Sequence, residues 1–200
     1  MELTLIRTSK SVNGEEQAVA KVTTPRERWV QEGLRALAAG GPDAVRIEVL
    51  AKRLGVTKGG FYWHFTDRAS LLGAMLDAWE QEGVDDPILK VDALHADGRS
   101  ALRELFAIAI GSIDRWPIEL AVREWARRDA SVLARVEQVD NRRMDYMRGL
   151  FSDFCRDEVE VEARCLLVFT TYVGHNFVAA SHGSLSRLDV IRASMELLLT

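Results

Sequence analysis

The side chains best suited to chemistry lie together in one short stretch, residues 57–64, which reads TKGGFYWH. Lys58 is long and cationic and can reach guanine acceptors or a phosphate. Tyr62 and His64 can hydrogen-bond phosphates, which positions a protein on DNA without reading its sequence. The two glycines between them let the backbone approach bases closely, although each costs a helix about 1 kcal/mol relative to alanine. The stretch therefore has the chemistry of a DNA contact.

Two short helices joined by a turn, within residues 46–65, must position this stretch. Apolar residues recur at helical spacing through the first helix, and they are Ile47, Leu50, Ala51 and Leu54. Gly55 follows them, where a helix stop favours positive φ. We expect the Thr57 hydroxyl to cap a second helix, which buries Phe61 and Phe65. This pattern predicts a helix-turn-helix, a unit that places its second helix in the DNA major groove.

Residues 50–72, LAKRLGVTKGGFYWHFTDRASLL, resemble the DNA-binding signature of the TetR family of bacterial transcriptional regulators. The matching letters are Leu50-Ala51, Gly55-Val56, Lys58-Gly59, Phe61-Tyr62, His64-Phe65, Asp67-Arg68 and Leu71-Leu72. The resemblance covers about Pro25–Gly83 and departs from the family at Gly60, where a second glycine follows the first. It implies an all-helical homodimer that represses a promoter until a small molecule binds its larger domain.

The predicted DNA contacts lie on or beside the two motif helices. Arg46, at the start of the first helix, is expected to anchor a phosphate, and the resemblance implies a phosphate contact for Arg68. Trp63 is expected to pack on a sugar or a methyl group. The full set is Arg46, Thr57, Lys58, Gly59, Gly60, Tyr62, Trp63, His64 and Arg68. The competing interpretation is that Tyr62 and Trp63 belong to the core.

One helix is expected before the motif and another after it. Thr24 and Glu27 form a capping box with Pro25 at the first helical position, and this helix runs to Gly40. The helix after the motif is expected to stop at Gly83. The helix before the motif should complete a three-helix core.

The rest of the chain shows helical periodicity only, so the predicted fold class is all-α. We expect helices over residues 98–115, 118–128, 132–154, 159–181 and 188–199, with a loop over residues 83–98. The predicted domains are a flexible arm over residues 1–23, a helix-turn-helix DNA-binding domain over 24–83, and a helical ligand-binding and dimerisation domain over 84–200. The last two helices are apolar on much of their surface, so we expect them to pair with those of a second chain. Burial inside one subunit is the alternative.

Candidate ligand residues lie on helices of the predicted domain over residues 84–200, and these helices are expected to converge. A mostly apolar cavity with a few polar groups is the usual small-molecule site. The candidates are Phe106, Trp116, Trp125, Met144, Met147, Phe169, Tyr172, His175 and Asn176. The last three of them fall within about one helical turn, so they can face one cavity. Ordinary core packing is the competing explanation for each residue.

Charge is distributed unevenly over the 200 residues. Residues 1–72 carry 11 basic and 8 acidic side chains, residues 73–200 carry 15 and 22, and the net charge is −4. A basic N-terminal part beside an acidic remainder suits a protein that binds DNA with one end.

Two cysteines are too few for a disulfide framework, and the N-terminus lacks a signal-peptide pattern, so we expect a cytoplasmic location. The apolar run Cys165–Phe169 is far short of a membrane span.

No catalytic or metal-binding motif stands out in the sequence. The histidines form neither HExxH nor a His/Cys cluster, and there is no GxSxG, P-loop or dinucleotide fingerprint. We therefore expect neither an enzyme nor a cofactor. The prediction is a dimeric repressor that leaves a near-palindromic DNA operator when a small-molecule effector binds. The sequence does not distinguish an activator from a repressor. The alternative function is a helical module that binds a ligand or partner and whose DNA-binding head is degenerate.

Overall fold

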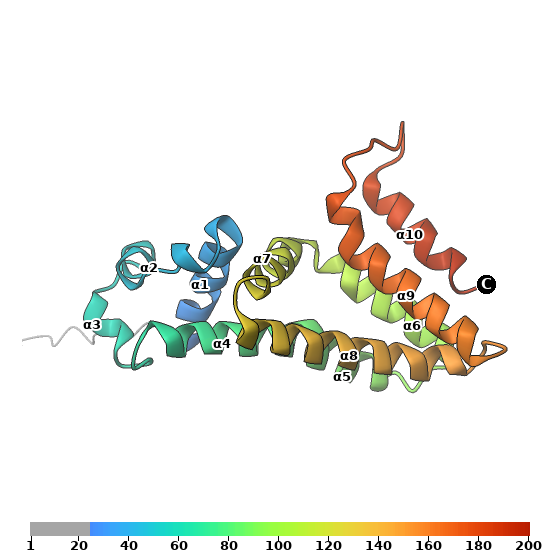
Figure 1. Ribbon diagram of the computed structural model, residues 1–200, viewed down its shortest axis with the longest axis horizontal. Coiled ribbons are helices and arrows are strands. Elements are labelled where there is room, and N and C mark those ends of the chain that lie inside the picture. Colours follow the sequence, from blue (N-terminus) through green and yellow to red (C-terminus); the bar gives the residue numbers. More distant parts are fainter. Residues whose placement is uncertain (1–24) are drawn as a thin grey trace, which may run out of the picture.

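The computed structural model describes residues 25–200, and every regular element in that range is helical. The predicted arm over residues 1–23 and the Thr24 cap lie outside the described residues. Helices α1, α2 and α3 form one end of an elongated molecule, and α6, α9 and α10 form the other (Figure 1). The elements are α1 (Arg26–Gly40), η1 (Pro42–Ala44), α2 (Ile47–Leu54), α3 (Lys58–Phe61), α4 (Arg68–Glu80), η2 (Gln81–Asp85), α5 (Asp86–Asp92), α6 (Gly98–Gly111), η3 (Ile113–Arg115), α7 (Trp116–Ala126), α8 (Ala130–Ser152), α9 (Glu158–Gly174), η4 (His175–Phe177) and α10 (Arg187–Leu197).

The helices of the head, α1 to α3, pack around the apolar residues that the sequence predicts. Trp29 of α1, Leu50 of α2 and Phe61 of α3 are fully buried. The rings of Trp29 and Phe61 meet edge to face, with their centroids 5.4 Å apart. Gly55 ends α2 with φ +70°, as expected for a glycine helix stop. The prediction of a helix-turn-helix within an all-α chain is confirmed.

Three details of the head differ from the prediction. Helix α3 ends at Phe61, and residues 62–64 form a turn rather than further helix. Two glycines in four residues explain the early end, because each weakens a helix. Thr57 is the N-cap residue of α3, but its hydroxyl makes no capping bond. Pro25 stands at the N-cap of α1 rather than at its first helical position.

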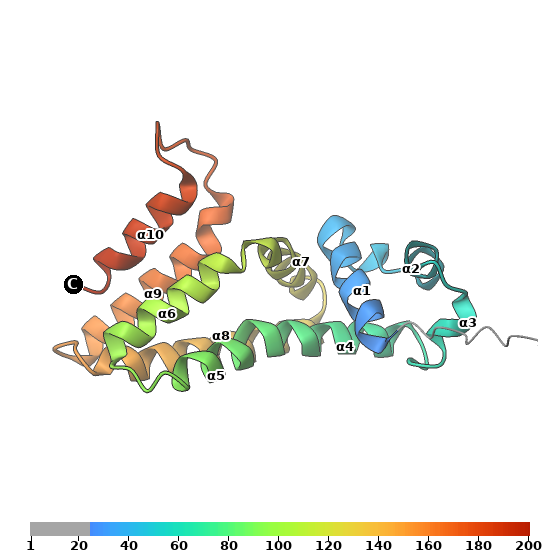
Figure 2. The same cartoon turned by 180° about the vertical axis from the view of Figure 1, so that it is seen from behind.

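The helix after the motif continues through Gly83 to Asp92, so the predicted helix stop at Gly83 is wrong. For the same reason the loop predicted over residues 83–98 is wrong over residues 83–92, and it is confirmed over residues 93–97. Helix α4 passes into the π-helical turn η2 and then into α5 without a break (Figure 2). Pro87 has no N–H to donate to the Gly83 carbonyl, and that oxygen accepts instead from Arg143 Nη2 at 3.4 Å. The wide turn absorbs the proline within a continuous helix.

Helix α9 ends at Gly174, so the helix predicted to run to residue 181 is too long. The carbonyl of His175 accepts from Arg187 Nη1 at 2.6 Å, and Arg187 Nη2 donates to the Ala180 carbonyl at 3.4 Å. Contacts from the start of α10 therefore satisfy backbone groups that a longer α9 would use itself. Glycine also weakens the last turn of the helix.

The long helix α8 takes part in two apolar cores. Val132 and Val136 of its first half join the core of α1, α4 and α7. Met147 and Phe151 of its second half join the core of α6, α9 and α10. The head therefore shares its core with part of the body, and a displacement of α7 or α8 must be felt by α1 and α4.

Candidate nucleic-acid interface and ligand cavity

The exposed end of the head is formed by α3 and the turn that follows it. Trp63 is 80% exposed and Tyr62 is 53% exposed, and Lys58 is exposed at the start of α3. The ring of Tyr62 meets Phe61 edge to face at a centroid distance of 5.3 Å. The competing interpretation of Tyr62 and Trp63 as core residues is therefore wrong. Both side chains are free to contact a partner of the head.

Lys58 forms an ion pair across the turn of the motif. Its Nζ lies 2.5 Å from Oε1 of Glu48 on α2. The hydrogen bond between them raises the pKa of Lys58 and lowers the pKa of Glu48. Both side chains are exposed, and exposed ion pairs are weak in water. Phosphates or base acceptors can therefore compete with Glu48 for the ammonium group.

The other predicted DNA contacts differ in how free their side chains are. Arg46 is exposed at the N-cap of α2. Arg68 is half-buried, and its guanidinium donates to the carbonyls of Val45, at 2.7 Å, and Pro42, so it also ties α4 to the segment before α2. Nε2 of His64 is buried with no partner within residues 25–200, which leaves Nδ1 for a phosphate. The remaining predicted contacts are exposed or half-buried, and they are Thr57, Gly59 and Gly60.

The body contains a cavity among η2, α5, α6, α8, α9 and α10. About 100 Å³ is open to the centres of water-sized molecules. One water needs roughly 10–15 Å³ by this measure, so the cavity holds a ligand of roughly ten non-hydrogen atoms. Most of its wall is apolar. Four of the predicted ligand residues line it, namely Phe106, Met147, Phe169 and Tyr172.

Five predicted ligand residues lie outside this lining, and the prediction that they face the cavity is wrong. The rings of Trp116 and His175 pack together with centroids 3.9 Å apart, and Asn176 Nδ2 lies 3.2 Å from His175 Nε2. The α-helix ends before His175, so the helical spacing from Tyr172 on which the prediction relied no longer holds. The other two residues pack in the apolar cores, and they are Trp125 and Met144.

One end of the cavity is polar, which the sequence pattern did not predict. Glu82, Arg115 and Arg143 line it, and Arg115 Nη1 forms an ion pair with Glu82 Oε2. Burial lowers the pKa of Arg115 and raises the pKa of Tyr172 on the same wall. The sequence does hold a sign of this polar end, because Arg115 stands directly before the apolar start of α7.

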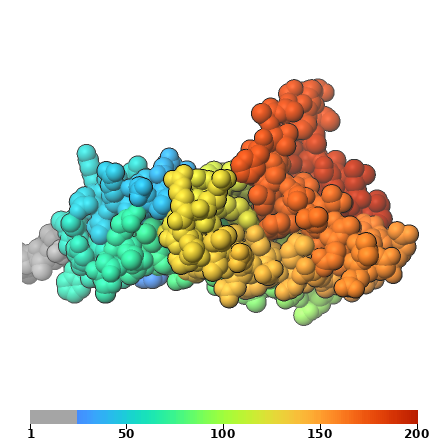
Figure 3. Space-filling model, in the orientation of Figure 1, coloured from blue at the N-terminus to red at the C-terminus, as the bar shows by residue number. Residues whose placement is uncertain are grey.

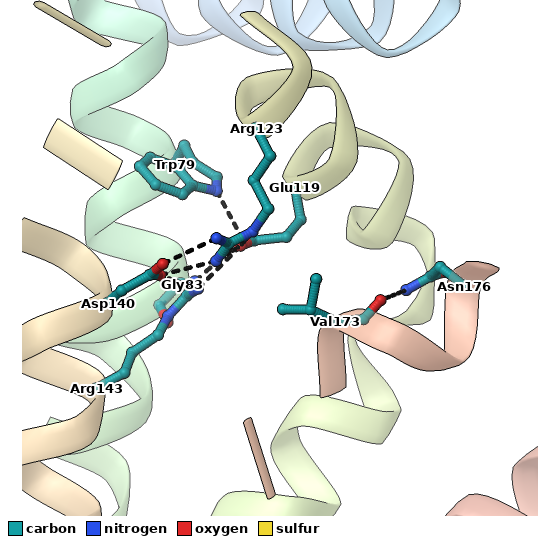
Figure 4. Close-up of polar contacts among 8 residues, drawn as sticks. All are labelled: Trp79, Gly83, Glu119, Arg123, Asp140, Arg143, Val173 and Asn176. Carbon is teal, nitrogen blue, oxygen red and sulfur yellow. Dashed lines mark hydrogen bonds and ion pairs between the residues drawn. The ribbon is translucent and has the colours of Figure 1, made fainter. Parts of the chain in front are cut away.

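A buried ionic cluster lies beside this polar end (Figure 4). Glu119 of α7 is 5% exposed, and it accepts from Trp79 Nε1 at 2.9 Å, Arg123 Nε at 2.8 Å and Arg143 Nη1 at 3.0 Å. Arg123 also donates two hydrogen bonds, of 2.7 and 2.8 Å, to the carboxylate of Asp140. Burial alone would raise the pKa of Glu119, but the two guanidinium groups lower it to about 2. The cluster therefore fixes α4, α7 and α8 against one another.

Comparison with known proteins identifies the head. Residues 30–75 match the family model described as bacterial regulatory proteins of the tetR family, and this segment contains α2, α3 and most of α4. In this segment the chain is similar to the TetR family. Two Pseudomonas putida proteins, the HTH-type transcriptional regulator SrpR and the uncharacterised regulator TtgW, are 30% identical over 60 residues, or 30% of this chain. These matches span 28% and 45% of the two relatives.

Solved structures of transcriptional regulators share the fold over nearly the whole chain. A TetR-family regulator from Streptomyces coelicolor is 17% identical, covers 87% of both chains and has a TM-score of 0.68. A regulator from Saccharomonospora viridis in complex with choline is 16% identical, covers 87% of this chain and 94% of its own, and scores 0.72. FadR from Bacillus subtilis in complex with stearoyl-CoA is 13% identical, covers 88% and 98%, and scores 0.66.

The TetR match ends before the cavity begins. Its residues stop at position 75, whereas the cavity wall starts at Glu82. The similarity in sequence is therefore confined to the head. The solved structures, at 13–17% identity, show that the rest of the chain shares their fold. Within residues 25–200, no three His, Cys, Asp or Glu side chains are grouped to hold a metal ion, and no helix has the length and apolarity to cross a membrane.

Proposed function

We propose that this chain is a dimeric transcriptional repressor of the TetR family that leaves its operator when a small molecule occupies the body cavity. The observation that carries the proposal is the exposed end of α3, where Lys58, Tyr62 and Trp63 extend from the helix-turn-helix within the matched segment. An ammonium group beside aromatic rings suits contacts to phosphates and base edges. We assign the chain to the cytoplasm, where it meets DNA.

Dimerisation is supported by an apolar surface on the helices farthest from the head. Leu166 and Leu167 of α9 are 57% and 51% exposed, and Leu197 of α10 is 71% exposed. In Figure 3 these helices, in orange and red, form the end of the molecule opposite the blue head. An exposed apolar patch of this kind marks an interaction site, and a second copy of the chain fits the family. Two heads would then dock in major grooves about 34–36 Å apart on a near-palindrome.

Communication between cavity and head is supported by the continuous helix of α4, η2 and α5. Its first turn is tied to the motif by Arg68, and its η2 segment lines the cavity through Glu82 and Gly83. A ligand that shifts η2 therefore shifts α4 and changes the position of the head. By linkage, DNA and ligand must weaken each other's binding to the same extent.

The test is selection of genomic fragments by the purified protein at moderate salt, followed by affinity measurements. We expect a palindromic site, and we expect Lys58→Ala to weaken binding to it by about tenfold or more. The matched control is Lys90→Ala, which removes the same charge from the exposed face of α5 and should leave operator affinity unchanged. A folded dimer that selects no sequence would instead support a ligand-binding module with a degenerate head.

A further inference from the structure

The polar end of the cavity has more hydrogen-bond donors than acceptors. Arg115 presents five N–H donors, and within residues 25–200 its one ion pair is with Glu82, on Nη1. Arg143 donates to Glu119 and to the Gly83 carbonyl with Nη1 and Nη2. A guanidinium group has no acceptor, so the unused capacity on this wall calls for an acceptor on the ligand.

The one acidic side chain on the wall is already engaged at both oxygens. Glu82 Oε2 pairs with Arg115, and Glu82 Oε1 accepts from Gln31 Nε2 at 2.9 Å. Gln31 belongs to α1 of the head and does not line the cavity. Glu82 is therefore a poor site for a ligand cation, and its carboxylate joins the head to Arg115.

We propose that the effector is a compact amphipathic anion whose carboxylate binds Arg115 and displaces Glu82. The inference rests on the regulator function proposed above. Arg143 is already paired with Glu119, so Arg115 is the guanidinium on this wall with donors to spare, and an acceptor on the ligand can use them. Arginine also matches a carboxylate with two parallel N–H donors. The whole ligand has roughly ten non-hydrogen atoms, and its apolar part lies against Phe106 and Phe169.

Displacement of Glu82 follows from repulsion between like charges. A second carboxylate at Arg115 stands next to the first one, and the two negative charges repel each other. As Glu82 moves away, it leaves Gln31 without its partner, and a hydrogen bond between head and body is lost. Binding of a charged ligand in the body cavity thereby changes a contact of α1.

The experiment is calorimetric titration of the full chain, without DNA, with 3-phenylpropanoate, 3-phenylpropan-1-ol and 3-phenylpropylamine. These probes share one apolar body and differ in charge. We expect the acid to bind about tenfold more tightly than the alcohol, since charge-assisted hydrogen bonds are the strong ones, and the amine to bind weakest. Arg115→Gln should remove the preference for the acid and leave alcohol affinity unchanged. Arg115→Lys should keep part of the preference for the acid over the alcohol.

Three further variants separate the steps of the proposal. Glu82→Gln removes the competing charge and should strengthen acid binding several-fold without affecting the alcohol. Gln31→Ala cuts the link to the head and should raise acid affinity by about twofold to tenfold, because binding no longer has to break that hydrogen bond. Arg103→Gln is the matched control, since Arg103 pairs with Glu196 on the surface of α6 and does not line the cavity.

The outcomes distinguish this inference from the proposed function. Equal or weaker binding of the acid than of the alcohol, or no acid binding at millimolar concentration, overturns the inference. Arg115→Gln weakening acid and alcohol alike would also overturn it, because that result indicates a structural role. No change on Gln31→Ala refutes the link to the head. None of these measurements needs an operator, so they are independent of whether the chain selects a DNA sequence.

Discussion

The buried carboxylate of Glu119 allows a quantitative prediction about stability. In the Glu119→Gln variant, the guanidinium groups of Arg123 and Arg143 lose their shared negative partner, and Arg143 loses most because Arg123 keeps Asp140. The pKa of Glu119 is lowered from 4.5 to about 2. At about 1.4 kcal/mol per pKa unit, the folded state favours the ionised carboxylate by about 3 kcal/mol. Breaking a buried ion pair on one side costs a similar 3–5 kcal/mol. We therefore expect a loss of about 3 kcal/mol at pH 7.

The dependence on pH has a definite sign. The folded pKa of Glu119 lies below its unfolded value of 4.5, so the unfolded chain binds the proton more readily. The contribution of Glu119 is fully present above about pH 4.5 and is lost as the pH falls toward 2. The glutamine variant has no proton to bind at this position. The difference in stability between the two proteins should therefore shrink as the pH falls through this range.

Urea denaturation followed by circular dichroism measures this difference at several pH values. For a chain of this length, about 3 kcal/mol also corresponds to a fall in melting temperature of roughly 6–12 °C. The matched control is Glu124→Gln on the same helix, where the carboxylate is exposed and pairs with Arg128 at 2.7 Å; it should change stability by less than about 1 kcal/mol. A Glu119→Gln protein within 1 kcal/mol of the original at pH 7, or a difference that does not depend on pH, would refute the reasoning.

Three further predictions concern particular positions. Gly98→Ala should destabilise the fold by about 1–3 kcal/mol because its methyl group would collide with the Leu150 carbonyl, whereas Gly149→Ala, with open space around it, should stabilise by about 0.5–1 kcal/mol; thermal melts compare them. Asp67→Ala removes the capping box of α4 and should cost about 1 kcal/mol in urea denaturation. Leu166→Glu should give a folded monomer by analytical ultracentrifugation, and a stable dimer would exclude this part of α9 from the interface.

The helix-turn-helix head could be predicted from sequence because its determinants are local. The spacing of Leu50 and Leu54, the glycine at position 55 and the buried Phe61 specify two short helices within twenty residues. Neighbouring positions along the chain decide which side chains stay outward, so Lys58 and Tyr62 were placed correctly on the exposed side. The length of α3 was less predictable, because glycines at positions 59 and 60 weaken a helix without setting its last residue.

The ligand cavity depended on packing between helices distant in sequence. Aromatic residues on body helices indicated that an apolar cavity could form, and four of the nine candidates line it. The helix break before His175 and the uninterrupted passage through Gly83 follow from contacts with Arg187 and Arg143, far away along the chain. The sequence by itself thus determined the helical class, the helix-turn-helix motif and its exposed side chains, since these depend on neighbours within one or two helical turns. Only the tertiary structure decided that Glu82, Arg115 and Arg143 meet at one end of a cavity, because their juxtaposition requires three separate helical segments to pack together.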